Sequence, residues 1–312
     1  MRDQRASAQI GLGLAALGRP GYINLGHGQD VADTSVERME REAHAVLDAA
    51  LEGGVRWFDA ARSYGRAEAF LASWLARRRL APGDVTVSSK WGYRYTAGWR
   101  VAVDEHEVKD LSAEHLRGQW AETRELLGEH LGLYQIHSAT LDSGVLDDRE
   151  VRRELDALRV RGVRVGLSVT GPGQGATIDR ALALGGFDAV QATWNLHERA
   201  AAAALARAHE AGLQVLVKEA VANGRLTARG GNETLAGAAR ERGVSADALA
   251  LAAALAQPWA DVVLSGAATV AQLESNLVAR DVVWDDELER RLAGLAEEPV
   301  AYWAARSELA WN

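Results

Sequence analysis

The sequence predicts a closed barrel of eight parallel strands with helices between them, a (β/α)8 or TIM barrel, from three observations. First, one phrase recurs along the chain: a helical stretch, a glycine, and then a short run rich in valine, isoleucine and leucine. A glycine at this place is typical of a helix end, because the backbone there turns left-handed. Second, the apolar runs are nearly continuous rather than alternating, as expected for parallel strands buried on both faces. Third, strand and helix patterns alternate eight times, which favours a closed parallel barrel.

The individual elements can be placed by residue range. Eight segments each contain one predicted strand. In 52–60, 130–138, 160–168, 184–192 and 210–218 the strand follows a helix end and a glycine, and 10–17, 84–90 and 261–266 complete the set. Helical patterns lie between them, among others over 35–52, 112–130 and 197–211. Ser112 and Asp148 suit the position just before a helix, because their side chains can accept a hydrogen bond from the first turn. An open, doubly wound sheet is the alternative that these patterns leave.

The whole chain, residues 1–312, is predicted to form one barrel domain, because no linker or change of composition divides it. Segments 18–34 and 91–111 are long loops that follow strands, and loops of that length usually carry function. Residues 299–312 form a C-terminal tail rich in aromatic side chains.

The composition excludes several kinds of protein and site. The chain has 312 residues, 48% hydrophobic and 25% charged, as expected of a globular barrel. It contains no cysteine, which excludes disulfides, thiolate catalysis and cysteine-ligated metals. A formal charge of −8 argues against nucleic acid as the main partner. No apolar run approaches the roughly 20 residues of a membrane span, and no secretory signal opens the sequence. We therefore expect a cytoplasmic protein, monomeric or weakly homo-oligomeric, without a membrane or nucleic-acid partner.

Lysine is scarce in this chain. Only Lys90, Lys109 and Lys218 occur, and arginine supplies the rest of the 35 basic residues. Lysine is a compact point charge that can lose its proton when buried, whereas arginine stays protonated. A lysine that this sequence retains is therefore a candidate for a task that arginine cannot perform.

Four ionisable residues are expected at the carboxyl ends of three neighbouring strands, where barrels of this kind place their chemistry. Asp59 ends the second strand and Tyr64 follows in its loop, while Lys90 ends the third strand and His137 the fourth. A tyrosine hydroxyl has an ordinary pKa of about 10, and a neighbouring ammonium lowers that pKa by favouring the phenolate. The carboxylate would hold the lysine, and the histidine would hydrogen-bond a substrate carbonyl. The other interpretation is a buried ion pair with two polar neighbours that have no catalytic task.

Six segments together resemble the aldo-keto reductase family over nearly the whole chain. They are GLG (11–13), VRWFDAARSYG (55–65), SSKWG (88–92), LYQIHS (133–138), VQATWN (190–195) and LSGAATVAQLESN (264–276). The resemblance implies a barrel that binds a nicotinamide cofactor, NAD(P)H, at the strand ends and reduces a small-molecule aldehyde or ketone. In that family pattern Tyr64 is the general acid, Lys90 and Asp59 tune it, and His137 orients the carbonyl.

The same resemblance implies a set of cofactor-binding residues. They are Ser168 and Gln191 at the nicotinamide carboxamide, Lys218 where the family often has a stacking aromatic, and Ser265, Gly266, Gln272 and Asn276 at the adenosine end. Two positions depart from the family pattern: Val169 replaces an asparagine, and Lys218 replaces the aromatic residue. These departures keep open a non-redox isomerase or dehydratase with the same Tyr64, Lys90 and His137. A regulatory module that merely binds the cofactor is a further alternative.

The predicted adenosine loop has no cation. Residues 266–276 contain no lysine or arginine and include the negative Glu274. A 2′-phosphate is normally met by arginine or lysine. The sequence therefore predicts no strong preference for NADPH, with NADH bound comparably or better, and Arg280 is the nearest cation that could reverse this.

For each of four other patterns, a purely structural explanation stands beside a functional one. The glycines of segment 11–16 match a dinucleotide fingerprint, but Gly18 and Pro20 prevent the helix that this fingerprint needs. Residues 106–110 resemble a zinc motif in which Asp110 replaces the second histidine, so no metal is expected. The segment GPGQG (171–175) is either an anion-binding nest or a tight loop into a helix. The aromatic residues of 91–111 are either the wall of a substrate pocket or core.

Overall fold

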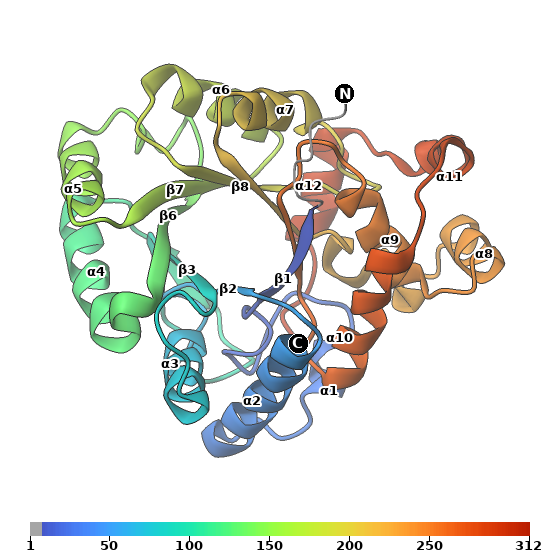
Figure 1. The fold of residues 1–312 in the computed structure, drawn as a ribbon, viewed down its shortest axis with the longest axis horizontal. Coiled ribbons are helices and arrows are strands. Elements are labelled where there is room, and N and C mark those ends of the chain that lie inside the picture. Colours follow the sequence, from blue (N-terminus) through green and yellow to red (C-terminus); the bar gives the residue numbers. More distant parts are fainter. Residues whose placement is uncertain (1–7) are drawn as a thin grey trace.

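The apolar runs of the sequence lie side by side in a ring. The computed structural model describes residues 8–312, and eight parallel strands form a closed barrel inside a ring of helices (Figure 1). The strands are β1 (Gln9–Gly13), β2 (Trp57–Asp59), β3 (Thr86–Trp91), β6 (Leu131–Ala139), β7 (Arg164–Val169), β8 (Ala189–Thr193), β9 (Gln214–Lys218) and β10 (Val262–Ser265). They neighbour one another in chain order, and β1 closes the ring by pairing with β10. The predicted (β/α)8 barrel is confirmed, and the open sheet is wrong.

Helices connect the strands and cover the outside of the barrel (Figure 1). They are α1 (His27–Asp30), α2 (Val36–Glu52), α3 (Ala67–Arg78), α4 (Ala113–Leu127), α5 (Arg149–Val160), α6 (Gln174–Leu184), α7 (Ala202–Glu210), α8 (Glu233–Glu241), α9 (Ala246–Leu255), α10 (Val270–Leu277), α11 (Asp286–Leu292) and α12 (Pro299–Ser307). Short 3-10 helices are η1 (Gly128–His130), η2 (Ala222–Gly224), η3 (Ala228–Gly230), η4 (Val278–Asp281) and η5 (Ala293–Leu295). Ser112 and Asp148 accept hydrogen bonds from the first turns of α4 and α5, so both predicted helix starts are confirmed.

The inside of the barrel is a packed layer of side chains. Trp57, Leu133, Leu216 and Val262 belong to one buried cluster there, separate from the larger core between strands and helices. Gly11 belongs to the same region, and a Cβ atom on it would lie 2.9 Å from both Leu264 and Val262. The glycine therefore lets these side chains fill the inside of the barrel without overlap. In barrels of this kind the active site lies at the carboxyl ends of the strands.

Two of the predicted loops contain regular structure. Residues 91–111 include an antiparallel hairpin of β4 (Tyr93–Tyr95) and β5 (Glu107–Lys109), which lies outside the barrel sheet. The tail after residue 298 begins with helix α12, with Pro299 in the first turn, where its fixed backbone angle suits a helix start. Among the described residues, no helix is long and apolar enough to cross a membrane.

Candidate active site

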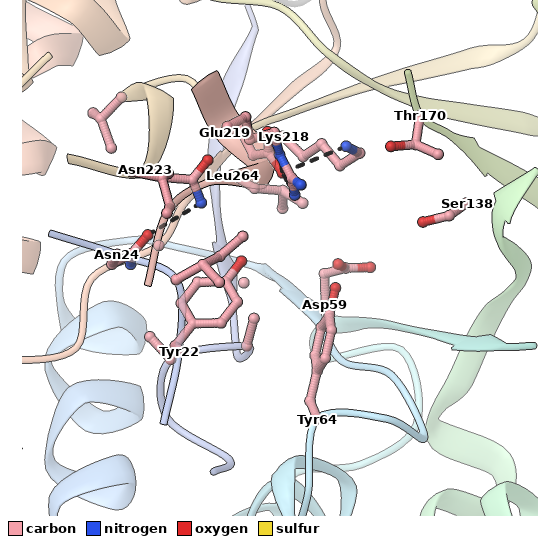
Figure 2. A pocket seen from close by; sticks show the side chains of 18 of the residues that line it. Tyr22, Asn24, Asp59, Tyr64, Ser138, Thr170, Lys218, Glu219, Asn223 and Leu264 are labelled. Atoms are coloured by element: carbon pink, nitrogen blue, oxygen red, sulfur yellow. Dashed lines mark hydrogen bonds and ion pairs between the residues drawn. The ribbon is translucent and has the colours of Figure 1, made fainter. Parts of the chain in front are cut away.

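A cavity of about 290 Å³ opens at the carboxyl ends of the barrel strands. Asp59, Tyr64 and His137 line it, so three of the four predicted catalytic side chains share one open space. Figure 2 shows Asp59 and Tyr64 on one side of this space, with Lys218 and Glu219 reaching into it from another. Strand ends on a common rim bring these residues together, although the chain separates the first from the last by more than 150 positions.

Lys90 lies directly behind the cavity wall and is buried. Its ammonium donates to the Asp59 carboxylate and, at 2.9 Å, to the Ala60 carbonyl oxygen. Asp59 also accepts a hydrogen bond of 2.7 Å from the Ser88 hydroxyl. The Lys90 Nζ atom lies 5.0 Å from the centre of the Tyr64 ring. The lysine is thus held in place by a buried carboxylate and faces the tyrosine, as the sequence predicted.

Tyr64 and His137 meet edge to face, with ring centres 5.5 Å apart and planes at 83°. The Tyr93 ring of the hairpin packs on the other side of His137 at 5.0 Å. The Ser63 hydroxyl lies 3.5 Å from Nδ1 of the histidine, at the limit of a hydrogen bond. Two aromatic rings and one hydroxyl therefore fix the orientation of the imidazole.

Burial determines the protonation states of this pair. Burial raises the pKa of Tyr64 well above its ordinary value of 10, and the nearby Asp59 carboxylate raises it further. The expected lowering of the tyrosine pKa is thus outweighed, because burial is the largest effect on the phenol and the Asp59 carboxylate adds to it. Burial also lowers the pKa of His137 well below 6.5, helped by the positive charges of Lys90 and Arg19. At neutral pH the cavity holds a phenol and a neutral imidazole.

Lys218 at the end of β9 forms a second charged cluster in the cavity. Its Nζ atom donates to the Thr193 hydroxyl at 2.7 Å and lies 3.7 Å from a Glu219 oxygen. Burial lowers the pKa of Lys218 to about 8, although the neighbouring Glu219 carboxylate opposes this. Burial alone would raise the pKa of Glu219, but Arg306 and Lys218 lower it to about 2. The cluster therefore holds two cations and one anion at neutral pH.

Sequence reasoning missed two arginines of the cavity wall. Arg306 of α12 donates hydrogen bonds of 2.5–3.0 Å to the Glu219 carboxylate from both Nε and a terminal nitrogen. Arg19, from the loop after β1, is buried between the rings of Tyr64 and Trp311, with its guanidinium carbon 5.1 and 4.7 Å from their centres. The sequence did indicate both segments as candidates for function, the first by its length as a loop and the second by its aromatic residues. In a chain so rich in arginine, nothing marked the individual arginines.

The predicted nicotinamide residues have different surroundings. Gln191 lines the cavity, and its side-chain nitrogen is buried without a partner among the described residues, as a group that awaits a ligand would be. The Ser168 hydroxyl accepts a 2.8 Å hydrogen bond from the backbone of Ser138, and Ser168 does not line the cavity. Val169 is completely buried, whereas the next residue, Thr170, reaches the cavity.

A second cavity, of about 330 Å³, contains the predicted adenosine end. It is lined by Gly266, Gln272 and Asn276, and it shares Gly266, Asn24 and Val221 with the first cavity. The buried Ser265 hydroxyl pairs with the Asn276 side chain at 2.8 Å and lines the first cavity. The two adjoining cavities suit an elongated ligand such as a dinucleotide.

The remaining sequence patterns resolve as follows. No helix opens directly after β1, which confirms that segment 11–16 is not a dinucleotide fingerprint. Among residues 8–312 no cluster of potential metal ligands occurs. The segment GPGQG leads into α6, whose first residue Gln174 bonds the backbone of Thr193 in both directions. Of the aromatic residues after Lys90, Tyr93 lines the cavity and Trp91 is buried in the core.

Comparison with known proteins decides the family. A sequence model described as the aldo/keto reductase family matches residues 9–297. The chain belongs to this family. Among solved structures, it is similar to aldo-keto reductase AKR11C1 from Bacillus halodurans in its holo form, with a TM-score of 0.71, 22% identity, and coverage of 96% of this chain and 95% of the other. It is also similar to PA4992 from Pseudomonas aeruginosa, with a TM-score of 0.62, 26% identity, and coverage of 88% and 90%. No curated protein sequence matches the chain.

As an aldo-keto reductase, the protein is an oxidoreductase of a family that acts on small-molecule carbonyl compounds and generally uses NAD(P)H. The cavities of this aldo-keto reductase fit such a cofactor in two respects. The unpartnered Gln191 nitrogen suits a carboxamide oxygen, and the linked second cavity gives room for the nucleotide.

Proposed function

We propose that this aldo-keto reductase reduces an aldehyde or ketone to an alcohol, with Tyr64 as the general acid. The observation that carries the proposal is the position of the Tyr64 phenol. It lies at the cavity wall between His137 and the Lys90–Asp59 ion pair, and its raised pKa keeps it protonated. A proton donor in a cavity of this family has the position that carbonyl reduction requires.

Each member of the set has a distinct task in this proposal. Gln191 and Lys218 would hold the nicotinamide end of the cofactor, whose chemistry when bound would be hydride donation to the carbonyl carbon. His137 is neutral and donates a hydrogen bond to the carbonyl oxygen, which orients the substrate. Tyr64 gives its proton to the same oxygen as negative charge develops there. Lys90 then stabilises the tyrosinate, and Asp59 holds the ammonium in place.

We assign the cofactor to the two linked cavities. Gln191 and Lys218 would hold the nicotinamide end, while Ser265 and Gly266 line the passage to the second cavity. Gln272 and Asn276 would bind the adenosine. Ser168 would act through Ser138, because its hydroxyl already holds that backbone amide.

One observation supports a second candidate. Lys218, with a pKa of about 8, lies in the cavity where many relatives have an aromatic residue, and such a lysine could exchange protons with a substrate. An isomerase or dehydratase that uses the same Tyr64 and His137 would then convert its substrate without consuming NADH or NADPH. Measuring cofactor oxidation alongside substrate loss separates the two functions.

The test of the proposed acid is Tyr64→Phe. We expect kcat to fall by about 10²–10⁴, the usual contribution of a positioned acid, with the Kd of the cofactor nearly unchanged. Steady-state kinetics with an aldehyde panel and fluorescence titration of the cofactor measure both quantities. Tyr93→Phe is the matched control, because Tyr93 lines the same cavity on the other side of His137. Near-normal turnover in Tyr64→Phe would transfer the proton donation to His137 or to water.

A further inference from the structure

We propose that Asp30 makes this protein select NADH by occupying the place and the partners that a 2′-phosphate would need. This inference rests on the proposed function and extends it to the choice of cofactor. It concerns the second cavity, to which Asp30 contributes from helix α1 and Arg229 from η3.

The first step is the contact between these two residues. The Arg229 guanidinium holds the Asp30 carboxylate with two parallel hydrogen bonds, of 2.7 and 2.5 Å. The same guanidinium donates to the Leu25 carbonyl oxygen at 2.8 Å. A planar fork of this kind is the geometry in which arginine binds carboxylates and phosphates most strongly. Arg229 is thus already engaged by a carboxylate of the protein.

The second step is the charge of the cavity wall. Among the described residues that line the second cavity, Arg229 is the one cation, and the same wall carries two carboxylates, Asp30 and Asp247. Burial would raise the pKa of Asp30, but hydrogen bonds from Arg229 and Gln272 lower it below its ordinary value, so the carboxylate is charged. A 2′-phosphate, with up to two negative charges, would therefore enter a wall whose net charge is already negative.

The third step is the donor that remains. The Gln272 side-chain nitrogen donates to the same Asp30 carboxylate at 2.8 Å, and its oxygen accepts from the Ala268 amide at 2.8 Å. The Arg229 guanidinium and the Gln272 amide thus both donate to Asp30. A carboxylate accepts hydrogen bonds from the hydroxyls of an unphosphorylated ribose, as acidic residues do in other dinucleotide sites, and repels a phosphate. The wall suits NADH.

The sequence suggested Arg280 as the cation that could favour NADPH. Arg280 does not line the second cavity, and its Nε atom donates to the Leu277 carbonyl oxygen at 3.3 Å. One of its terminal nitrogens lies instead toward Gly54, beyond the end of α2. Arg280 is therefore the matched control for Arg229.

The experiment is a set of binding titrations on the full chain. NADH and NADPH are titrated by fluorescence against the wild type, Asp30→Asn, Asp30→Asn/Arg229→Ala and Arg280→Ala. ADP-ribose and its 2′-phosphate are titrated by calorimetry, because they report on the second cavity without the nicotinamide. We expect the wild type to bind NADH at least as tightly as NADPH. Asp30→Asn should improve the Kd for NADPH relative to NADH at least tenfold, because it removes a like charge and frees Arg229.

The remaining variants show which residue causes the change in the ratio of NADPH to NADH affinity. Adding Arg229→Ala should cancel the gain in NADPH affinity, and Arg280→Ala should leave the wild-type ratio unchanged. A wild-type preference for NADPH above tenfold overturns the inference, and so does an unaltered ratio in a folded Asp30→Asn variant. If that variant does not fold, the wild-type ratio and the two ADP-ribose ligands decide. Failure of every form to bind either dinucleotide would overturn the proposed function itself, a result distinct from binding with the wrong preference.

Discussion

Lys90 and Lys218 lie at the carboxyl ends of two strands of the same barrel, but their ammonium groups have different surroundings. Lys90 is fully buried and bound by the Asp59 carboxylate, with a backbone oxygen as its second acceptor. Lys218 is 16% exposed and shares its nearest carboxylate, Glu219, with an arginine that binds it more closely. The first lysine is fixed as a point charge, whereas the second can release its proton near physiological pH.

For Lys90 we predict that arginine cannot substitute. Lys90→Arg should lose nearly as much kcat as Lys90→Met, because the larger, forked guanidinium cannot fit behind Tyr64 and still meet Asp59. Steady-state kinetics of both variants, with circular dichroism to show that the barrel is intact, make the comparison. If Lys90→Arg retains most of the activity, any cation suffices at this position.

For Lys218 we predict a pH-dependent contribution to stability. Its pKa of about 8 in the folded protein lies below the ordinary 10.5, so between these values the unfolded chain binds a proton that the folded protein does not. The free energy of unfolding of the wild type relative to Lys218→Met should therefore rise as the pH increases from 7.5 to 9.5. The slope is at most about 1.4 kcal/mol per pH unit.

Urea unfolding across this range measures the effect. The difference between Lys218→Arg and Lys218→Met is the control, and it should stay flat because neither side chain titrates there. A pH-independent difference between the wild type and Lys218→Met would mean that the lysine keeps its ordinary pKa in the folded protein.

At the scale of elements, the C-terminal segment completes the site. Trp311 stacks on His106 with ring centres 3.9 Å apart, and the Arg19 guanidinium lies over the same indole. Asn312 and Tyr22 exchange two backbone hydrogen bonds, of 3.1 and 3.2 Å, which tie this segment to the loop after β1. The rim of the cavity therefore depends on contacts between the two ends of the described chain.

We predict that Trp311→Ala raises KM for the carbonyl substrate with little change in kcat. The indole holds the Arg19 guanidinium in the cavity wall through a cation–π contact, so its loss should loosen that wall and raise KM by roughly two- to tenfold. Trp284→Ala is the control, because Trp284 is also partly buried but lies outside both cavities. An unchanged KM in Trp311→Ala would show that this wall does not contact the substrate.

Some elements escaped sequence analysis for physical reasons. The β4–β5 hairpin has two strands of three residues each, too short for a period to appear, and it forms because Tyr93 packs on His137. The run 10–17 was predicted to be one strand, but β1 ends at Gly13. Buried residues such as Leu14 and Leu17 continue the apolar pattern beyond the strand, so hydrophobicity alone could not show its end.

At the scale of the whole molecule, barrel topology accounts for what could be predicted. Once eight parallel strands were recognised, Asp59, Lys90 and His137 had to meet at one rim, since each lies within the last three residues of one of three neighbouring strands. The sign of the Tyr64 pKa shift could not be predicted, because it depends on how deeply the phenol is buried and on how close the Asp59 carboxylate lies to it. The ion pairs Asp30–Arg229 and Glu219–Arg306 join segments that are far apart in the chain. A local sequence pattern cannot predict such pairs.

The three lysines have a consequence for chemical labelling. The positive charges of Lys90, Lys109 and Lys218 all act on His137, so every lysine of the chain gathers around one end of the barrel. Lys90 is enclosed, whereas Lys109 is exposed and Lys218 lines the cavity, and burial lowers the pKa of both of these amines. An acylating reagent should therefore modify this end of the barrel rather than the arginine-rich remainder of the described surface.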